Sequence, residues 1–236
     1  MNQYDAVRRP MASFYSSQRH ISRRHLPRDP MSCRTHFWGA VASVVGTLFF
    51  WIKSQWISQN PLSTTLSLVV FGLSLVALYS ASAYYHYYVG NPKTEFRLRK
   101  LDHSMIYVLI AGSYTPICVQ FLEESKKVPF LIFIWAFALI GIVVKCFWFQ
   151  APRWIYTSIY LLMGWSLLID LPGFLSMGPQ ALGLLAAGGI FYTIGGVIYM
   201  IKKPTLPQPF GFHEIFHIFV LLGSLMHFLT AYLFIA

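Results

Sequence analysis

The sequence of 236 residues has very few charged side chains. Asp, Glu, Lys and Arg together make up 11% of it, whereas soluble globular domains carry about 25%. Hydrophobic residues make up 56%, so the chain has too few polar groups to cover a surface in water. This composition excludes a soluble enzyme, a disordered protein and a coiled coil.

Acidic residues and cysteines are scarce as well. The 8 Asp and Glu stand against 18 Lys and Arg, which gives a net charge of +10. In a soluble protein that imbalance would suggest binding to nucleic acid, but in a membrane protein it reports the orientation in the bilayer. We therefore predict no nucleic-acid partner. The 3 cysteines are an odd number without paired spacing, which argues against a disulfide framework or a cysteine-ligated metal.

Long apolar runs fill the chain from residue 36 onward. A helix needs about 20 apolar residues to cross the hydrocarbon core of a bilayer, and backbone polar groups cannot stay unpaired in lipid. Seven runs meet this length requirement or approach it, at residues 36–57, 63–88, 101–122, 128–149, 154–170, 179–201 and 212–235. We therefore predict an all-α integral membrane protein, a seven-transmembrane-helix bundle over residues 36–236.

Residues 1–35 differ from the rest of the chain. They are rich in Arg, Ser and Pro and contain no long apolar run, which is typical of a disordered basic tail; a transit peptide is the alternative. If the seven spans alternate, 15 of the 18 Lys and Arg lie on the side of this tail. The positive-inside rule then predicts a cytoplasmic N-terminus and an external C-terminus, and we expect a multi-pass protein of the plasma membrane.

Ionisable residues inside these spans are the strongest functional signal, because burying them in lipid is costly. His86 closes the second span, Asp102 opens the third, and His213 and His217 open the seventh, so all four lie at one predicted depth. Histidines four residues apart share one face of a helix. Three imidazoles plus water form a catalytic zinc arrangement, and we predict a Zn²⁺ site at His86, His213 and His217.

Two further residues are candidates for catalysis beside this metal. Asp102 could hydrogen-bond the water on the metal or orient a ligand. Ser82 lies four residues before His86 on the same helix face and could contact a ligand or a developing oxyanion. The alternative is that each buried histidine only bonds to a neighbouring helix, and this is the interpretation we give to His227. For His36, which starts the first span, we expect an interfacial role.

The segment from His213 to His217 also satisfies the HExxH pattern of zinc proteases. In that interpretation Glu214 is the general base and the reaction is intramembrane proteolysis. The pattern is short and leaves His86 and Asp102 unexplained, so we keep proteolysis as a minor alternative.

Several motifs together resemble the hemolysin III family, which belongs with the progestin and adipoQ receptors and, more distantly, the alkaline ceramidases. They are the SAYYH segment at 82–86, LDH at 101–103, AGSYTP at 111–116 and FHEIFH at 212–217. The resemblance covers about residues 35–236. It implies a zinc ion near the cytoplasmic leaflet with His86, His213 and His217 as ligands, Asp102 acting through water, and Ser82 as the serine of an SxxxH motif. One departure is Ser32, which stands where the family usually has Asn.

The leading functional hypothesis is a zinc-dependent hydrolase of a lipid amide or ester, similar to a ceramidase, with a membrane lipid as substrate or ligand. Two alternatives remain open: a non-enzymatic cytolytic protein whose zinc clamps helices together, and a receptor-like protein. A transporter is disfavoured because the polar residues gather at one membrane face and form no track across the bilayer.

Overall fold

The computed structural model of the chain describes residues 27–56, 62–207 and 210–236. All regular structure in these ranges is helical: α2 (Pro30–Trp56), α3 (Leu62–Tyr87), α4 (Pro92–Phe121), α5 (Glu124–Phe147), α6 (Arg153–Gly164), the 3-10 helix η1 (Ser166–Asp170), α7 (Leu171–Leu175), α8 (Gly178–Ile201) and α9 (Phe212–Phe234). They provide 7 spans long and apolar enough to cross a membrane, with α6, η1 and α7 sharing the fifth. The prediction of an all-α, seven-span membrane protein is confirmed; its sidedness stays a prediction.

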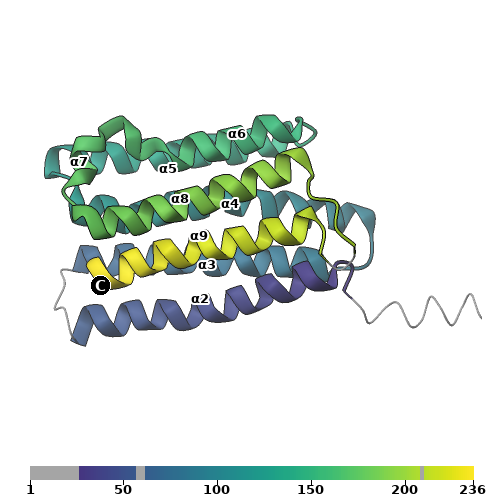
Figure 1. Cartoon of the computed structure of the whole chain (residues 1–236), viewed down its shortest axis with the longest axis horizontal. Coiled ribbons are helices and arrows are strands. Elements are labelled where there is room, and N and C mark those ends of the chain that lie inside the picture. Colours follow the sequence, from purple (N-terminus) through teal and green to yellow (C-terminus); the bar gives the residue numbers. More distant parts are fainter. Residues whose placement is uncertain (1–26, 57–61, 208–209) are drawn as a thin grey trace, which may run out of the picture.

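The helices form one bundle of roughly antiparallel rods (Figure 1). In the described residues α2 packs against α3 and α9, α4 against α3, α5 and α6, and α8 against α6 and α9. In the 18-residue apolar stretch that characterises each span, 56% is buried in α3 and in α4, whereas the buried share is at most 33% in every other span. Side chains of α3 and α4 therefore line the interior, and the remaining helices present much of their surface to lipid.

Glycines allow the inner helices to approach closely. A Cβ atom built on Gly112 of α4 would lie 2.3 Å from the Oγ atom of Ser74 on α3, and one on Gly72 would lie 2.2 Å from Oγ1 of Thr47 on α2. A side chain at either position would push the neighbouring helix away. The α2, α3 and α4 layers are thus spaced by the absence of side chains at these two points.

Two helices, α2 and α4, begin six or more residues before the apolar runs that predict them. The amide oxygen of Asn91 accepts a hydrogen bond of 2.8 Å from the backbone N–H of Lys93, and Pro92 follows it at the first helical position, a common start for a helix. Asp102 therefore lies inside α4 and not at its start. Likewise α2 begins at Pro30, so residues 30–35, which we had expected in the tail, are helical.

The fifth span is interrupted after Gly164. The Tyr114 hydroxyl donates to the carbonyl of Gly164 at 2.7 Å and accepts from the N–H of Leu167 at 2.9 Å. These bonds satisfy backbone groups that the break would otherwise leave unpaired in an apolar layer. The predicted end at residue 170 is short, because η1 and α7 carry the span on to Leu175.

Candidate metal centre

Three histidines converge at the end of the bundle where α3 ends and α9 begins, which we call the histidine end. One ligand nitrogen from each of His86, His213 and His217 lies within 4.8 Å of the other two. His86 and His217 are each only 2% exposed. Because α9 places His213 one turn before His217, both rings reach the ring that α3 contributes. The group could hold a metal ion.

The spacing of one pair of nitrogens fits a small tetrahedral ion. The Nε2 atoms of His86 and His213 are 3.3 Å apart. Two nitrogens that each lie 2.0–2.1 Å from a tetrahedral zinc are separated by about 3.3–3.4 Å. The ring centroids of His213 and His217 are 4.6 Å apart, so the third imidazole lies in the same small volume.

A carboxylate orients the His86 ring. Oδ2 of Asp29 lies 2.8 Å from Nδ1 of His86, and the backbone N–H of Asp29 donates to the His86 carbonyl at 3.1 Å. The hydrogen bond from His86 lowers the pKa of Asp29 to about 2, so this side chain is an ionised acceptor. With Nδ1 donating, Nε2 is left with a lone pair, which is the usual arrangement of a metal-ligating histidine.

Our sequence prediction placed Asp29 in the tail and so missed it. The signal was present, because an Asp followed by Pro is a typical start of a helix, and the sequence holds only 8 acidic residues. The salt bridge between Oδ2 of Asp29 and Nε of Arg28 at 3.0 Å adds a second contact to the same oxygen.

His36 was also interpreted too simply. Because α2 begins at Pro30, His36 lies inside the helix, and its ring stacks on that of His217 with centroids 3.7 Å apart and an interplanar angle of 6°. The Tyr79 ring meets it edge-on at 5.0 Å. His36 therefore covers the histidine group from the α2 side, where we had expected an interfacial role.

Asp102 and Ser82 face the same interior space as the histidines. Both are buried, both line one cavity with His213 and His217, and the two side chains lie close enough to interact. Asp102 also lies near His86. The structure thus places a carboxylate and a hydroxyl beside the three imidazoles.

Glu214 is occupied elsewhere. Its Oε2 accepts from the backbone N–H of Gly211 at 2.9 Å, and its Oε1 accepts from the Ser32 hydroxyl at 3.0 Å. Both oxygens are therefore used to cap α9 and to bind α2. This arrangement disfavours the protease interpretation of HExxH, and it gives Ser32 a role that the sequence did not suggest.

The histidine end opens into two adjoining spaces. A polar vestibule of about 290 Å³ is lined by Asp29, Arg99 and Arg153 among others. A narrower cavity of about 130 Å³ runs on between α3, α4, α6, α8 and α9, with walls of Leu and Ile side chains. One water needs about 10–15 Å³ of such space, so each can hold much more than a water. Asp102, His103, Tyr199 and His213 line both spaces.

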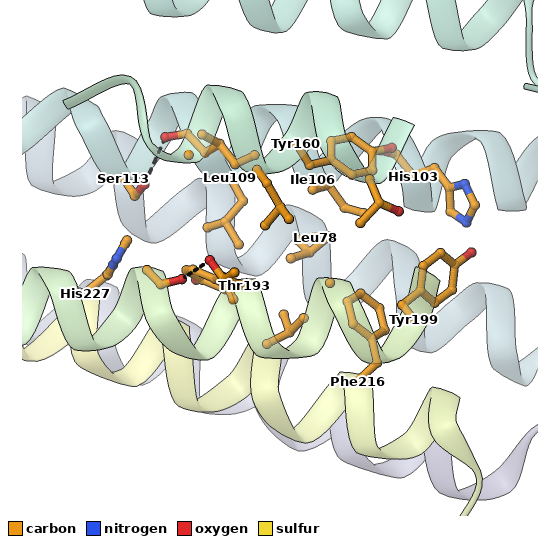
Figure 2. A pocket seen from close by; sticks show the side chains of 18 of the residues that line it. Leu78, His103, Ile106, Leu109, Ser113, Tyr160, Thr193, Tyr199, Phe216 and His227 are labelled. Carbon is orange, nitrogen blue, oxygen red and sulfur yellow. Dashed lines mark hydrogen bonds between the residues drawn. The ribbon is translucent and has the colours of Figure 1, made fainter. Parts of the chain in front are cut away.

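Figure 2 shows the long axis of the narrower cavity, with His103 and Tyr199 toward one end and Ser113 and His227 toward the other. The two polar ends are joined by apolar walls that include Leu78, Ile106 and Leu109. His227, which we had placed away from the site in a structural role, therefore shares a cavity with His213 and His217.

Comparison with known proteins shows the family of this chain. A family model described as haemolysin-III related matches residues 24–228. The chain belongs to the haemolysin-III-related family. The Hemolysin-3 homolog of Bacillus subtilis (strain 168) is 36% identical over 80% of this chain and 86% of that protein. Hemolysin-3 of Bacillus cereus is 34% identical over 82% of this chain and 85% of that protein.

A more distant relative is the adiponectin receptor protein of Drosophila melanogaster, 26% identical over 94% of this chain and 53% of that protein. This match agrees with the wider relationship of haemolysin-III-related proteins to adipoQ receptors that the motifs indicate. The matched region of the family model includes Asp29, Ser82, Asp102 and all three candidate ligands.

Proposed function

We propose that this haemolysin-III-related protein is a zinc-dependent hydrolase that cleaves an amide or ester bond of a membrane lipid. The observation that carries the proposal is the position of the three-histidine group. It lies where a polar vestibule meets an apolar cavity, beside a buried carboxylate and a buried hydroxyl. We place the protein in the plasma membrane with the histidine end toward the cytoplasm, as the basic loops predict.

Zinc is the metal that fits the donors best. Imidazole nitrogens suit zinc, and three protein ligands leave the fourth tetrahedral position for water, as in catalytic sites. A zinc ion held there would polarise the substrate carbonyl and lower the pKa of its water to about 7. His86, oriented by Asp29, and the α9 pair would supply the three nitrogens.

The side chains around the ligands would handle protons and charge. Asp102 would accept the proton of the attacking water, and its burial in the cavity wall keeps it close to the reaction. The Ser82 hydroxyl would donate a hydrogen bond to the carbonyl oxygen as negative charge develops on it. Both roles need the reacting carbon to lie at the junction of the two spaces.

The shapes of the two spaces suit an amphiphilic substrate. The vestibule, lined by Arg99 and Arg153, would take a polar headgroup. The cavity, walled by Leu109, Leu185 and Val220, would take an acyl chain. The bond between the two parts of the lipid would then lie beside Asp102 and His213, which line both spaces.

The test is turnover by purified protein in detergent or nanodiscs, on a panel of ceramides, N-acylated amines and glycerolipid esters. We expect product from the wild type, and none from His217→Ala or from protein stripped by a chelator, with recovery on adding Zn²⁺. Ser43→Ala is the control, because that buried hydroxyl bonds within α2 and does not line the cavity. Equal turnover by His217→Ala and wild type would overturn the proposal.

A second candidate is a membrane-lytic protein in which the metal only joins helices. The names of the two Bacillus relatives favour it, and a metal ion held by the candidate ligands would join α3 to α9. Asp102→Asn distinguishes the two candidates. Lysis of red cells or vesicles by that variant with its metal still bound would support the lytic role. Loss of both lysis and lipid turnover would support the hydrolase.

A further inference from the structure

The end of the cavity opposite the histidine end forms a second polar site. We propose that this far end binds a hydroxyl group on the distal part of an amphiphilic ligand. The far end is defined by Ser113 of α4, Trp165, Thr193 of α8 and His227 of α9, all of which line the cavity. On α9, His227 lies ten residues after His217, which corresponds to about 15 Å along the helix axis.

His227 is the unusual member of this group. Its Nδ1 and Nε2 atoms are both buried, and neither makes a well-directed hydrogen bond with the described residues, although the Leu185 backbone lies close enough to interact with the ring. A carbonyl can satisfy only the N–H of a neutral imidazole, so the other nitrogen keeps a free lone pair. Buried polar atoms normally have partners, so this nitrogen needs one that the protein does not supply.

The backbone is shaped to admit that ring. A Cβ atom on Gly188 would lie 2.2 Å from Cδ2 of His227 and 2.6 Å from its Nε2. The Tyr192 ring holds the other side, edge-on with centroids 5.3 Å apart. The position of His227 is therefore fixed by the absence of a side chain at Gly188 and by the presence of an aromatic ring.

The neighbouring hydroxyl groups of Ser113 and Thr193 already donate hydrogen bonds to backbone carbonyls. Ser113 donates to the Ile110 carbonyl at 2.9 Å. Thr193 donates to the Gly189 carbonyl at 2.7 Å and accepts from Trp165 Nε1 at 3.0 Å. What these residues still offer is lone pairs. The far end is thus a set of hydrogen-bond acceptors, and it selects a donor.

The donor has to be neutral. No charged side chain defines the far end, and an ammonium buried without a counter-ion would be strongly disfavoured. A hydroxyl meets both conditions. The inference rests on the proposed function in one respect, since the ligand's other polar group would lie at the histidine end, about 15 Å away. The ligand class is therefore a long-chain acyl compound with a hydroxyl near the end of its chain.

Binding of carboxylic acids tests this directly, because they carry no bond to hydrolyse. Saturated acids with a terminal hydroxyl are compared with the same acids lacking it, over chain lengths that bracket about 15 Å. The protein is the full chain in nanodiscs, and affinities come from calorimetry. At the matching length we expect the hydroxy acid to bind about 2- to 10-fold more tightly, the gain of one hydrogen bond, with no preference at shorter lengths.

Two variants locate the preference. His227→Phe keeps an aromatic ring but removes the lone pair, and Ser113→Ala removes a neighbouring acceptor; each should reduce or abolish the preference for the hydroxy acid. Ser43→Ala, which removes a similar intrahelical hydroxyl bond outside the cavity, should keep it.

Equal wild-type affinity for both acids at every length would overturn the inference, and so would a preference that survives in both variants. A preserved preference in a protein that hydrolyses no lipid would refute the hydrolase and leave the hydroxyl site standing.

Discussion

Both ends of the cavity contain histidine side chains, but the residues around these histidines differ. At the histidine end three imidazoles converge, and Asp29 and Asp102 lie beside them. At the far end His227 lies among hydroxyls and aromatic rings, and none of the described residues that define this end is charged. The difference shows that the chemistry available to a histidine in this bundle depends on the residues around it.

The largest expected effect is a loss of metal binding that depends on the histidine end alone. His217→Ala should lower metal affinity by at least about 100-fold, because even partners of metal ligands account for 10–100-fold. His227→Ala should keep the full metal content. Elemental analysis of both purified variants measures the contrast, and equal metal loss in the two would contradict the division of roles between the ends.

Asp102→Asn separates chemistry from metal binding at the histidine end. We expect hydrolysis to fall by about 10²–10⁴-fold, the usual contribution of a positioned acid or base, while the metal content stays at the wild-type level. The measurement pairs a turnover assay with elemental analysis on the same sample. Loss of metal together with activity would show that Asp102 supports the ion itself.

Asp29→Asn should weaken metal binding by about 10–100-fold, because His86 would lose its charged acceptor. Glu95→Gln is the matched control. Glu95 also pairs with Arg28, at 2.6 Å, and within the described part of the chain it makes no hydrogen bond or ion pair with a candidate ligand. Competition with a chelator of known affinity measures both. If the control loses as much metal affinity, the loss comes from the disturbed pairing with Arg28 and not from the hydrogen bond to His86.

The smallest effect concerns the far end. Gly188→Ala should lower the free energy of unfolding by about 1–3 kcal/mol through overpacking, because its methyl group would overlap the His227 ring. Gly183→Ala on the same helix has open space around the added carbon and should be neutral or slightly stabilising. Thermal unfolding in one detergent compares them, and metal content should change in neither.

The sequence predicted the spans well because apolar length is a strong signal in lipid. It also assigned His86, His213 and His217 to one depth, since alternating spans determine which helix ends meet. It failed at the start of α2, where Ser, Cys and Arg interrupt the apolar pattern although the backbone is already helical. Asp29 was missed, and His36 was misinterpreted, for that reason.

Other features depend on packing that no linear pattern contains. The cavity runs from His213 to His227 because side chains that come from different helices leave space between them. The capping role of Glu214 depends on the approach of Ser32 from α2. A short motif such as HExxH gives no information about either.

The order in which the chain is made gives the position of α9 a further meaning. This helix supplies two of the three candidate ligands, His213 and His217, and it is the last of the seven spans to be synthesised. Until α9 has been inserted beside α2 and α3, the membrane holds a bundle with a single one of these histidines. Metal capture would then mark the completion of assembly, and a ribosome that stops before α9 would release a chain that cannot be loaded.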